Sequence, residues 1–109
     1  MLKLSVPLKV RRSLKVFVKN LKGRFRDAEV YLFGSYARGD WVEDSDVDVI
    51  VISGKFKGLS FPERVKLIRK LAPENISLEI LAYTPEEFKI LLKKSVTIRD
   101  ASTYWIKLT

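Results

Sequence analysis

The sequence predicts an α/β (α+β) fold in which helices pack on a small mixed sheet. Three observations lead to this prediction. Helical and strand patterns alternate along the chain, two helix starts carry clear capping signals, and one loop separates two short apolar strands. With 109 residues the chain is large enough for one hydrophobic core and too small for two, so we expect a single domain over residues 1–109.

The first element is a basic amphipathic helix, expected from about Pro7 to Lys22. Its apolar positions recur at helical spacing, and Gly23 follows the last of them as a stop signal. These apolar positions are Val10, Leu14, Phe17, Val18 and Leu21. Residues 1–26 contain nine Lys or Arg and no acid, so the helix carries a strong positive charge.

Two short strands follow the helix. Residues 29–33 form an apolar run that ends at Gly34, and residues 47–52 form a β-branched run that ends before Gly54. Between them lies GSYARGDWVEDS, whose glycines, serines and acids are typical of a loop, with room for one helical turn at residues 36–38. We expect this loop to be the most specialised part of the chain.

The second half of the chain predicts two further helices and two strands. Two residue pairs have the spacing of capping boxes: Ser60 with Glu63, and Thr84 with Glu87. A proline follows Thr84 at the first helical position. Residues 77–83 alternate between apolar and mixed positions, which indicates a strand. The last fifteen residues predict one or two helical turns and then a strand over about residues 104–108.

The composition limits the chemistry that is available. Because the chain has no Cys and no His, a site must use carboxylates, hydroxyls and metal ions. Residues 27–48 contain seven acids and a single cation, Arg38, which favours a bound divalent cation. No apolar run reaches the ~20 residues that span a bilayer, and the N-terminus lacks a secretory pattern, so we expect a cytoplasmic protein without a membrane partner.

The candidate metal ligands are Asp46 and Asp48. Residues two apart in a strand have Cα atoms roughly 6.6–6.8 Å apart, and their side chains leave the same face. Mg²⁺ is often bound by one or two carboxylates together with substrate phosphates. An isolated pair of this kind is more often a solvated loop edge. Here Gly34 and Ser35 follow the preceding strand, where a glycine lets backbone N–H groups approach a phosphate and a serine adds a donor.

Two other phosphate or metal motifs are excluded. Gly34 and Gly39 have P-loop spacing, but Asp40 and Trp41 occupy the positions of the required Lys and Ser or Thr. An EF-hand is excluded because Val49 replaces its glycine and Lys55 its bidentate glutamate.

The composite pattern of this loop resembles a known signature. The loop contains Gly34-Ser35, then Ala37-Arg38-Gly39, then Ser45-Asp46-x-Asp48. This combination is similar to the motif of the DNA polymerase β superfamily, and within it to the minimal nucleotidyltransferases. The resemblance runs from the strand before Gly34 to the strand at residues 77–83. It implies the palm fold of that superfamily.

The resemblance also implies roles for individual residues. Asp46 and Asp48 would hold Mg²⁺, two ions in this superfamily, and Glu79 stands where a third acid, more often Asp, completes the site. Gly34 and Ser35 would hold the β- and γ-phosphates of ATP or another nucleoside triphosphate. Arg38 would either neutralise the leaving group or lock the loop onto Asp40 or Asp44, and the sequence leaves both roles open.

The function implied is transfer of a nucleoside monophosphate, AMP in the first instance, from Mg-NTP to a protein hydroxyl. Minimal nucleotidyltransferases that resemble this chain often act as antitoxins and adenylylate a tyrosine of a small helical toxin of the HEPN type. We therefore expect such a toxin as the partner, in a homo- or hetero-oligomer. Because antibiotic adenylyltransferases carry an extra domain for the acceptor, we expect the acceptor here to lie on the partner.

Two alternatives remain open at the level of sequence. The basic stretch over residues 3–26 favours a nucleic-acid-binding module, although no aromatic stacking pattern accompanies it. The replacement of the usual Asp by Glu79 is compatible with a nucleotide- or RNA-binding regulatory subunit that has no turnover. Among the loop residues, we interpret Ser45 as a loop cap and Tyr36 and Trp41 as packing residues.

Overall fold

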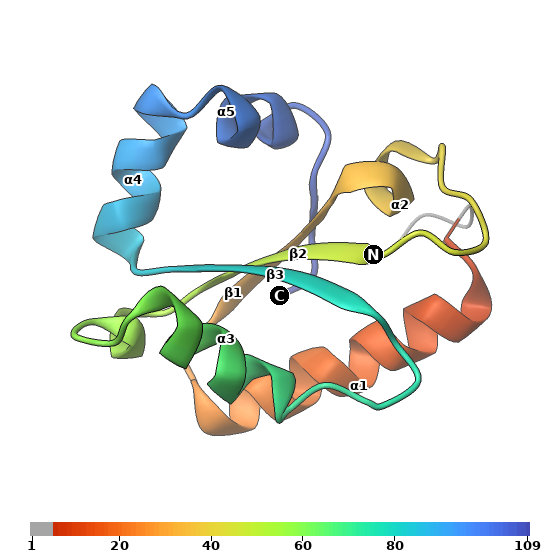
Figure 1. Ribbon diagram of the computed structural model, residues 1–109, viewed down its shortest axis with the longest axis horizontal. Helices are drawn as coiled ribbons and strands as arrows, with labels where there is room; N and C mark the ends of the chain where they lie inside the picture. Colours follow the sequence, from red (N-terminus) through yellow and green to blue (C-terminus); the bar gives the residue numbers. More distant parts are fainter. Residues whose placement is uncertain (1–5) are drawn as a thin grey trace.

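The computed structural model describes residues 6–109 as a four-stranded mixed sheet with helices on both faces (Figure 1). This confirms the predicted fold class. The elements in chain order are α1 (Leu8–Arg24), β1 (Glu29–Phe33), α2 (Gly34–Arg38), β2 (Val47–Ile52), η1 (Gly54–Phe56), α3 (Phe61–Arg69), β3 (Leu78–Tyr83), α4 (Pro85–Lys94), α5 (Val96–Ser102) and β4 (Ile106–Lys107).

The strand order in the sheet is β3-β2-β1-β4. β1 runs antiparallel to both of its neighbours, β2 and β4, whereas β2 and β3 are parallel. A parallel pair needs a crossover connection, and η1 and α3 supply it here. As a result, the residues that begin β2 and β3 lie at the same end of the sheet.

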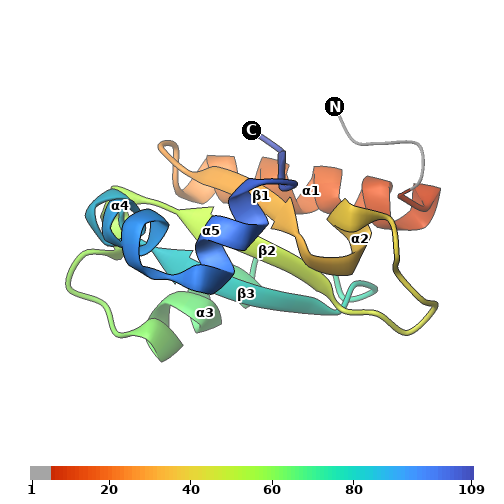
Figure 2. The same ribbon diagram turned by 90° about the horizontal axis from the view of Figure 1, so that it is seen from above.

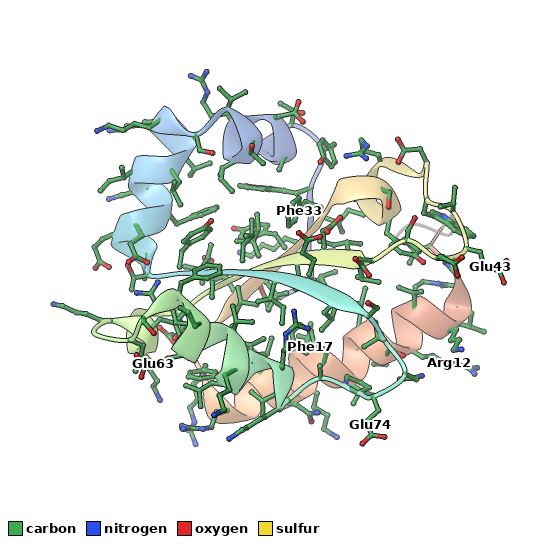
Figure 3. All side chains as sticks on the ribbon, viewed as in Figure 1. Arg12, Phe17, Phe33, Glu43, Glu63 and Glu74 are labelled. Carbon is green, nitrogen blue, oxygen red and sulfur yellow. The ribbon has the colours of Figure 1, made fainter. Side chains whose placement is uncertain are left out.

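One face of the sheet packs on α1 and α3, which lie below it in Figure 1. The apolar stripe of α1 packs into this layer: Leu14, Phe17 and Leu21 are 0–1% exposed, and Val10 and Val18 are partly buried. Figure 3 shows Phe17 between α1 and the sheet, and Val49 and Val51 belong to the same buried cluster. Burying each such side chain stabilises the fold by about 1.5–3 kcal/mol.

The other face packs on α4 and α5, as the view from above shows (Figure 2). Its core contains Ile50 and Ile52 of β2 together with Phe88 and Ile98 from the two helices. Since side chains alternate along a strand, the odd-numbered valines of β2 face α1 and the even-numbered positions face α4 and α5. The even-numbered Asp48 therefore belongs to the α4/α5 face.

The predicted helix starts are confirmed. Ser60 and Glu63 form a complete capping box at α3, and Thr84 and Glu87 form another at α4. Glu87 also accepts a bidentate ion pair from Arg64, which is 7% exposed and lies beside β3. This pair ties α3 and α4 together around the outer edge of the sheet.

The predicted boundaries are close to those observed. The strands at residues 29–33 and 47–52 have the predicted bounds, and α1 continues two residues beyond Lys22. The short η1 was not predicted, and β4 is limited to two residues that pair with Tyr31 and Leu32. Among residues 6–109, no helix combines the length and the apolar character that crossing a membrane requires.

Candidate active site

The parallel pairing of β2 and β3 brings two of the expected acids together. Asp48 and Glu79 are register partners on adjacent strands, so their side chains leave the same face of the sheet. Asp48 is half-buried and Glu79 is exposed. The Glu79 carboxylate is close enough to Asp48 to raise the pKa of that residue.

Asp46 lies one residue before β2, near the end of the strand that carries Asp48, and its carboxylate is engaged elsewhere. Its Oδ1 accepts a 2.6 Å hydrogen bond from Ser77 Oγ, at the start of the neighbouring strand. In the part of the chain that the structure describes, no three acidic side chains converge into a compact metal-binding group. Asp46 therefore lies at the same end of the sheet as Asp48 and Glu79, but its carboxylate is turned toward Ser77.

The electrostatics of Asp48 reflect this crowding. Burial, followed by the nearby Glu79 and Asp46 carboxylates, raises the pKa of Asp48 to about 6. Arg38 acts on this pKa in the opposite direction, with a smaller effect. A partly buried carboxylate next to two others is costly to ionise, and a bound cation would remove that cost.

Gly34 brings the backbone against this carboxylate. It adopts φ +71°, the left-handed region that favours glycine, at the point where β1 passes into α2. A Cβ at this position would lie 1.9 Å from Asp48 Oδ2, which no side chain tolerates. The glycine therefore allows α2 to begin directly beside the acids.

Ser35 follows Gly34 in the first turn of α2 and is half-buried. Its carbonyl accepts the N–H groups of Gly39 and Asp40, at 2.9 and 3.2 Å, which closes the turn. Within residues 6–109 its hydroxyl makes no hydrogen bond, so it is available to a ligand. Gly34 and Ser35 thus lie where a phosphate could be held next to Asp48.

Arg38 is exposed at the end of α2 and contacts two groups. Its Nε donates to Asp40 Oδ2 at 3.1 Å, and its Nη1 donates to the Tyr104 hydroxyl at the same distance. These hydrogen bonds raise the pKa of Arg38 above its ordinary value, Asp40 having the larger effect. Of the two possible partners predicted for locking the loop, Asp40 makes the contact.

Tyr104 is a site residue that the sequence analysis did not single out. Its hydroxyl also accepts a 3.2 Å hydrogen bond from the Gly34 N–H, and its ring lies under the Arg38 guanidinium at 5.4 Å. The pairing of β4 with β1 brings this C-terminal residue to the loop. No local signal marks Tyr104, because the contact joins positions 70 residues apart.

The remaining loop residues have structural roles, as interpreted from the sequence. Ser45 Oγ accepts the Val42 N–H at 2.9 Å and so caps the turn before Asp46. Tyr36 is 5% exposed and its ring stacks on Trp41, with centroids 5.5 Å apart. Both aromatic rings pack at the edge of the core.

A mixed sheet with helices on both faces, and with acids gathered beside a glycine-serine turn, is the architecture of the nucleotidyltransferase class. Comparison with known families supports this directly: the family model of the nucleotidyltransferase domain matches residues 12–102. The chain belongs to this family.

Several curated relatives are named as protein adenylyltransferases. The chain is 33% identical over 97 residues to "Putative protein adenylyltransferase MJ0141" of Methanocaldococcus jannaschii, covering 87% of this chain and 94% of that protein. Other matches are shorter. The alignment with MJ0604 of the same organism is 44% identical over 43 residues, 38% of this chain and 43% of that protein. Protein adenylyltransferase MntA of Thermococcus cleftensis is 54% identical over 33 residues, 30% of this chain and 33% of MntA.

Solved structures share the fold. A Sulfolobus solfataricus structure described as a "putative nucleotidyltransferase" has a TM-score of 0.63 at 22% identity, covering 96% of this chain and 86% of that one. A toxin-antitoxin structure with AMP-PNP has a TM-score of 0.60 at 23% identity, covering 87% of this chain and 71% of the matched chain. At these identities the likeness concerns the fold.

Proposed function

We propose that this nucleotidyltransferase moves AMP from Mg-ATP onto a hydroxyl of a partner protein, and that it acts as the antitoxin of a two-gene toxin-antitoxin pair. The observation that carries the proposal is the register pairing of Asp48 with Glu79 beside Gly34 and Ser35. The names of the relatives support a protein as acceptor, and the neighbour described as a toxin-antitoxin with AMP-PNP supports the partner and the nucleotide. A small helical toxin of the HEPN type is the partner we expect.

The acids fit a divalent cation by their chemistry. Three carboxylates on adjacent strand ends provide hard oxygen ligands. Burial, followed by the neighbouring carboxylates, raises the pKa of Asp48 to about 6, so a bound cation would favour its ionised form. In this proposal Asp46, Asp48 and Glu79 hold Mg²⁺, two ions by analogy with the superfamily. When bound, Mg²⁺ supplies positive charge that neutralises the phosphates and favours deprotonation of the attacking hydroxyl.

The residues of the chain have separate tasks in the reaction. The hydroxyl of Ser35 holds the β- and γ-phosphates, Gly34 lets them approach the backbone closely, and Arg38 stabilises negative charge as pyrophosphate leaves. The acceptor oxygen forms a bond to the α-phosphorus, the bond from the α-phosphorus to the bridging oxygen breaks, and Glu79 or water takes the acceptor proton. Because Asp46 and Glu79 are both exposed, a side chain from another molecule can reach this edge.

The test is transfer of label from α-³²P-ATP, with Mg²⁺, to the protein encoded by the neighbouring gene. We expect label on that partner with the wild-type chain and none with Asp46→Asn/Asp48→Asn. The matched control is Glu43→Gln/Asp44→Asn, which removes two charges from the same exposed loop and should retain transfer. Transfer by the Asp46→Asn/Asp48→Asn variant, or absence of transfer with all four nucleoside triphosphates, would overturn the proposal.

The alternative of a nucleotide-binding subunit without turnover has one supporting observation. Glu79 has one methylene more than the Asp found more often at this position, which changes the reach of the third acid. Binding of Mg-ATP with no transfer to any partner would favour that alternative. The same labelling experiment therefore separates the two functions.

A further inference from the structure

The outer face of α1 carries a row of cations, which we call the basic stripe: Arg12, Lys15, Lys19 and Lys22. All four are exposed, and they lie opposite the buried Leu14, Phe17 and Leu21 of the same helix. Figure 3 shows Arg12 on the outer side of α1, away from the sheet. Successive members are three or four residues apart, so neighbouring side chains lie on one face of the helix.

The basic stripe has no acidic partner within residues 6–109. The ion pairs in this part of the chain are Arg38–Asp40, Arg64–Glu87 and Lys107–Glu29, none of which involves α1. Lys22 Nζ donates to the backbone carbonyls of Arg26 and Ala28, which leaves its charge uncompensated. Like charges at these helical spacings repel one another, so an external anion would stabilise the stripe.

Further exposed cations lie on α3, whose C-terminal end approaches α1. Asn20 on α1 donates to the Leu71 carbonyl just after α3 at 2.9 Å. Exposed Lys66 lies on α3, and exposed Lys70 follows its last residue. Asp48 and Glu79 lie on the opposite face of the sheet, so an anion bound to the basic stripe does not meet these two acids.

We propose that the basic stripe binds the phosphodiester backbone of a nucleic acid. Its members follow one another every ~4.5–6 Å along the helix, and they span about 15 Å of its axis, enough to contact several consecutive phosphates. An anionic membrane is a poorer fit, because Leu14, Phe17 and Leu21 of α1 are buried in the core and the exposed apolar side chains of this helix are only the separate Leu8 and Val16. The contact is electrostatic and reads no base sequence, so it needs no aromatic stacking residues.

The test measures binding of the purified chain to fluorescent duplex RNA, duplex DNA and single-stranded RNA by anisotropy. With about four phosphate contacts on a duplex, we expect affinity to fall roughly a hundredfold between 50 and 200 mM salt. The triple variant Arg12→Glu/Lys15→Glu/Lys19→Glu should weaken binding at least about tenfold. Comparison of the RNA and DNA arms identifies which nucleic acid the surface prefers.

The matched control is Lys89→Glu/Lys93→Glu/Lys94→Glu, which makes the same change in net charge on exposed positions of α4. We expect this control to bind within about threefold of wild type at equal salt. Equal weakening by both triple variants would assign binding to net charge and overturn the proposal. Binding to phosphatidylglycerol vesicles but to no nucleic acid would also overturn it.

Folding is checked independently of binding. All three substituted positions of the basic stripe are exposed, so the triple variant should keep the far-ultraviolet circular dichroism and cooperative unfolding of wild type. If the triple variant does not fold, the single variants Arg12→Glu and Lys19→Glu are compared with Lys93→Glu. We expect each of the first two to lose binding affinity, by less than the triple variant. Singles that bind as tightly as Lys93→Glu would overturn the proposal.

Discussion

The backbone of Gly34 lies directly against the carboxylate of Asp48, leaving no room for a side chain between them. A Cβ on Gly34 would approach Asp48 Oδ2 to 1.9 Å, while its φ of +71° already favours glycine. This contact joins the element proposed to hold phosphate to the strand that carries the acids. It makes residue 34 a sensitive test of the site.

We predict that Gly34→Ala lowers nucleotidyl transfer at least about a hundredfold and reduces the free energy of unfolding by about 1–3 kcal/mol. The control is Gly58→Ala, since Gly58 also has a positive φ, +84°, but a Cβ there would meet no atom within 4 Å. Gly58→Ala should show the backbone strain alone, with activity retained. Equal transfer by the two variants, measured with urea unfolding in parallel, would contradict the role of this contact.

The pKa of Asp48 leads to a prediction about stability and pH in the absence of metal. Because the folded-state pKa is raised from 3.8 to about 6, the folded protein binds more protons than the unfolded one between those values. Its contribution to stability is present below about pH 4 and is lost as pH rises to about 6. We expect Asp48→Asn to avoid this loss.

In EDTA, Asp48→Asn should therefore be more stable than wild type at about pH 7.5, by about 1–2 kcal/mol after allowance for partial exposure, and similar to it near pH 4. Urea unfolding at the two pH values provides the measurement. Adding Mg²⁺ should stabilise wild type at about pH 7.5 and leave Asp48→Asn nearly unchanged. A variant less stable than wild type at the higher pH would contradict the raised pKa that burial and the neighbouring acids give Asp48.

Glu79 is the acid whose side chain departs from the common pattern of the superfamily. We predict that Glu79→Gln lowers the rate of transfer by about a hundredfold or more, because the amide neither binds a cation well nor accepts the acceptor proton. Glu79→Asp should retain a measurable fraction of the rate, since it keeps the charge on the same strand face. Single-turnover transfer assays compare the two. A wild-type rate for Glu79→Gln would remove this residue from the proposed site.

Tyr104 is predicted to act as a positioning residue. Tyr104→Phe keeps the ring under Arg38 but loses the hydrogen bonds from the Gly34 N–H and Arg38 Nη1, each contributing about 0.5–1.5 kcal/mol. We expect KM for Mg-ATP to rise about five- to thirtyfold while kcat changes less. The control is Tyr83→Phe, at the far end of β3. Equal KM values for the two variants would show that the Tyr104 hydroxyl does not position the loop.

The sequence predicts the strands and the capped helices well because their signals are local. The β-branched run of β2 is bounded by turn residues, and Ser60 and Thr84 have capping partners three residues away. These features depend on spacing and not on the details of packing. The association of Glu79 with Asp48 is implied by the family resemblance, and their register on the parallel pair of strands is seen in the structure.

Long-range contacts at the site are not predictable in this way. Tyr104 reaches Gly34 only because β4 pairs with β1, and the two-residue β4 carries almost no pattern of its own. The hydrogen bond from Ser77 to Asp46 depends on a side-chain rotamer at an exposed position. In both cases the determining information lies in tertiary structure.

In the proposed reaction, the acids of β2 and β3 direct attack at the α-phosphorus of ATP. Comparing α-³²P-ATP with γ-³²P-ATP as donors to the purified partner, using wild type and Asp48→Asn, tests this point without intermediate assumptions. We expect stable label from the α position, released pyrophosphate from the γ-labelled donor, and neither with the variant. Label transferred from the γ position would show phosphoryl transfer instead and would contradict the proposed role of the acids.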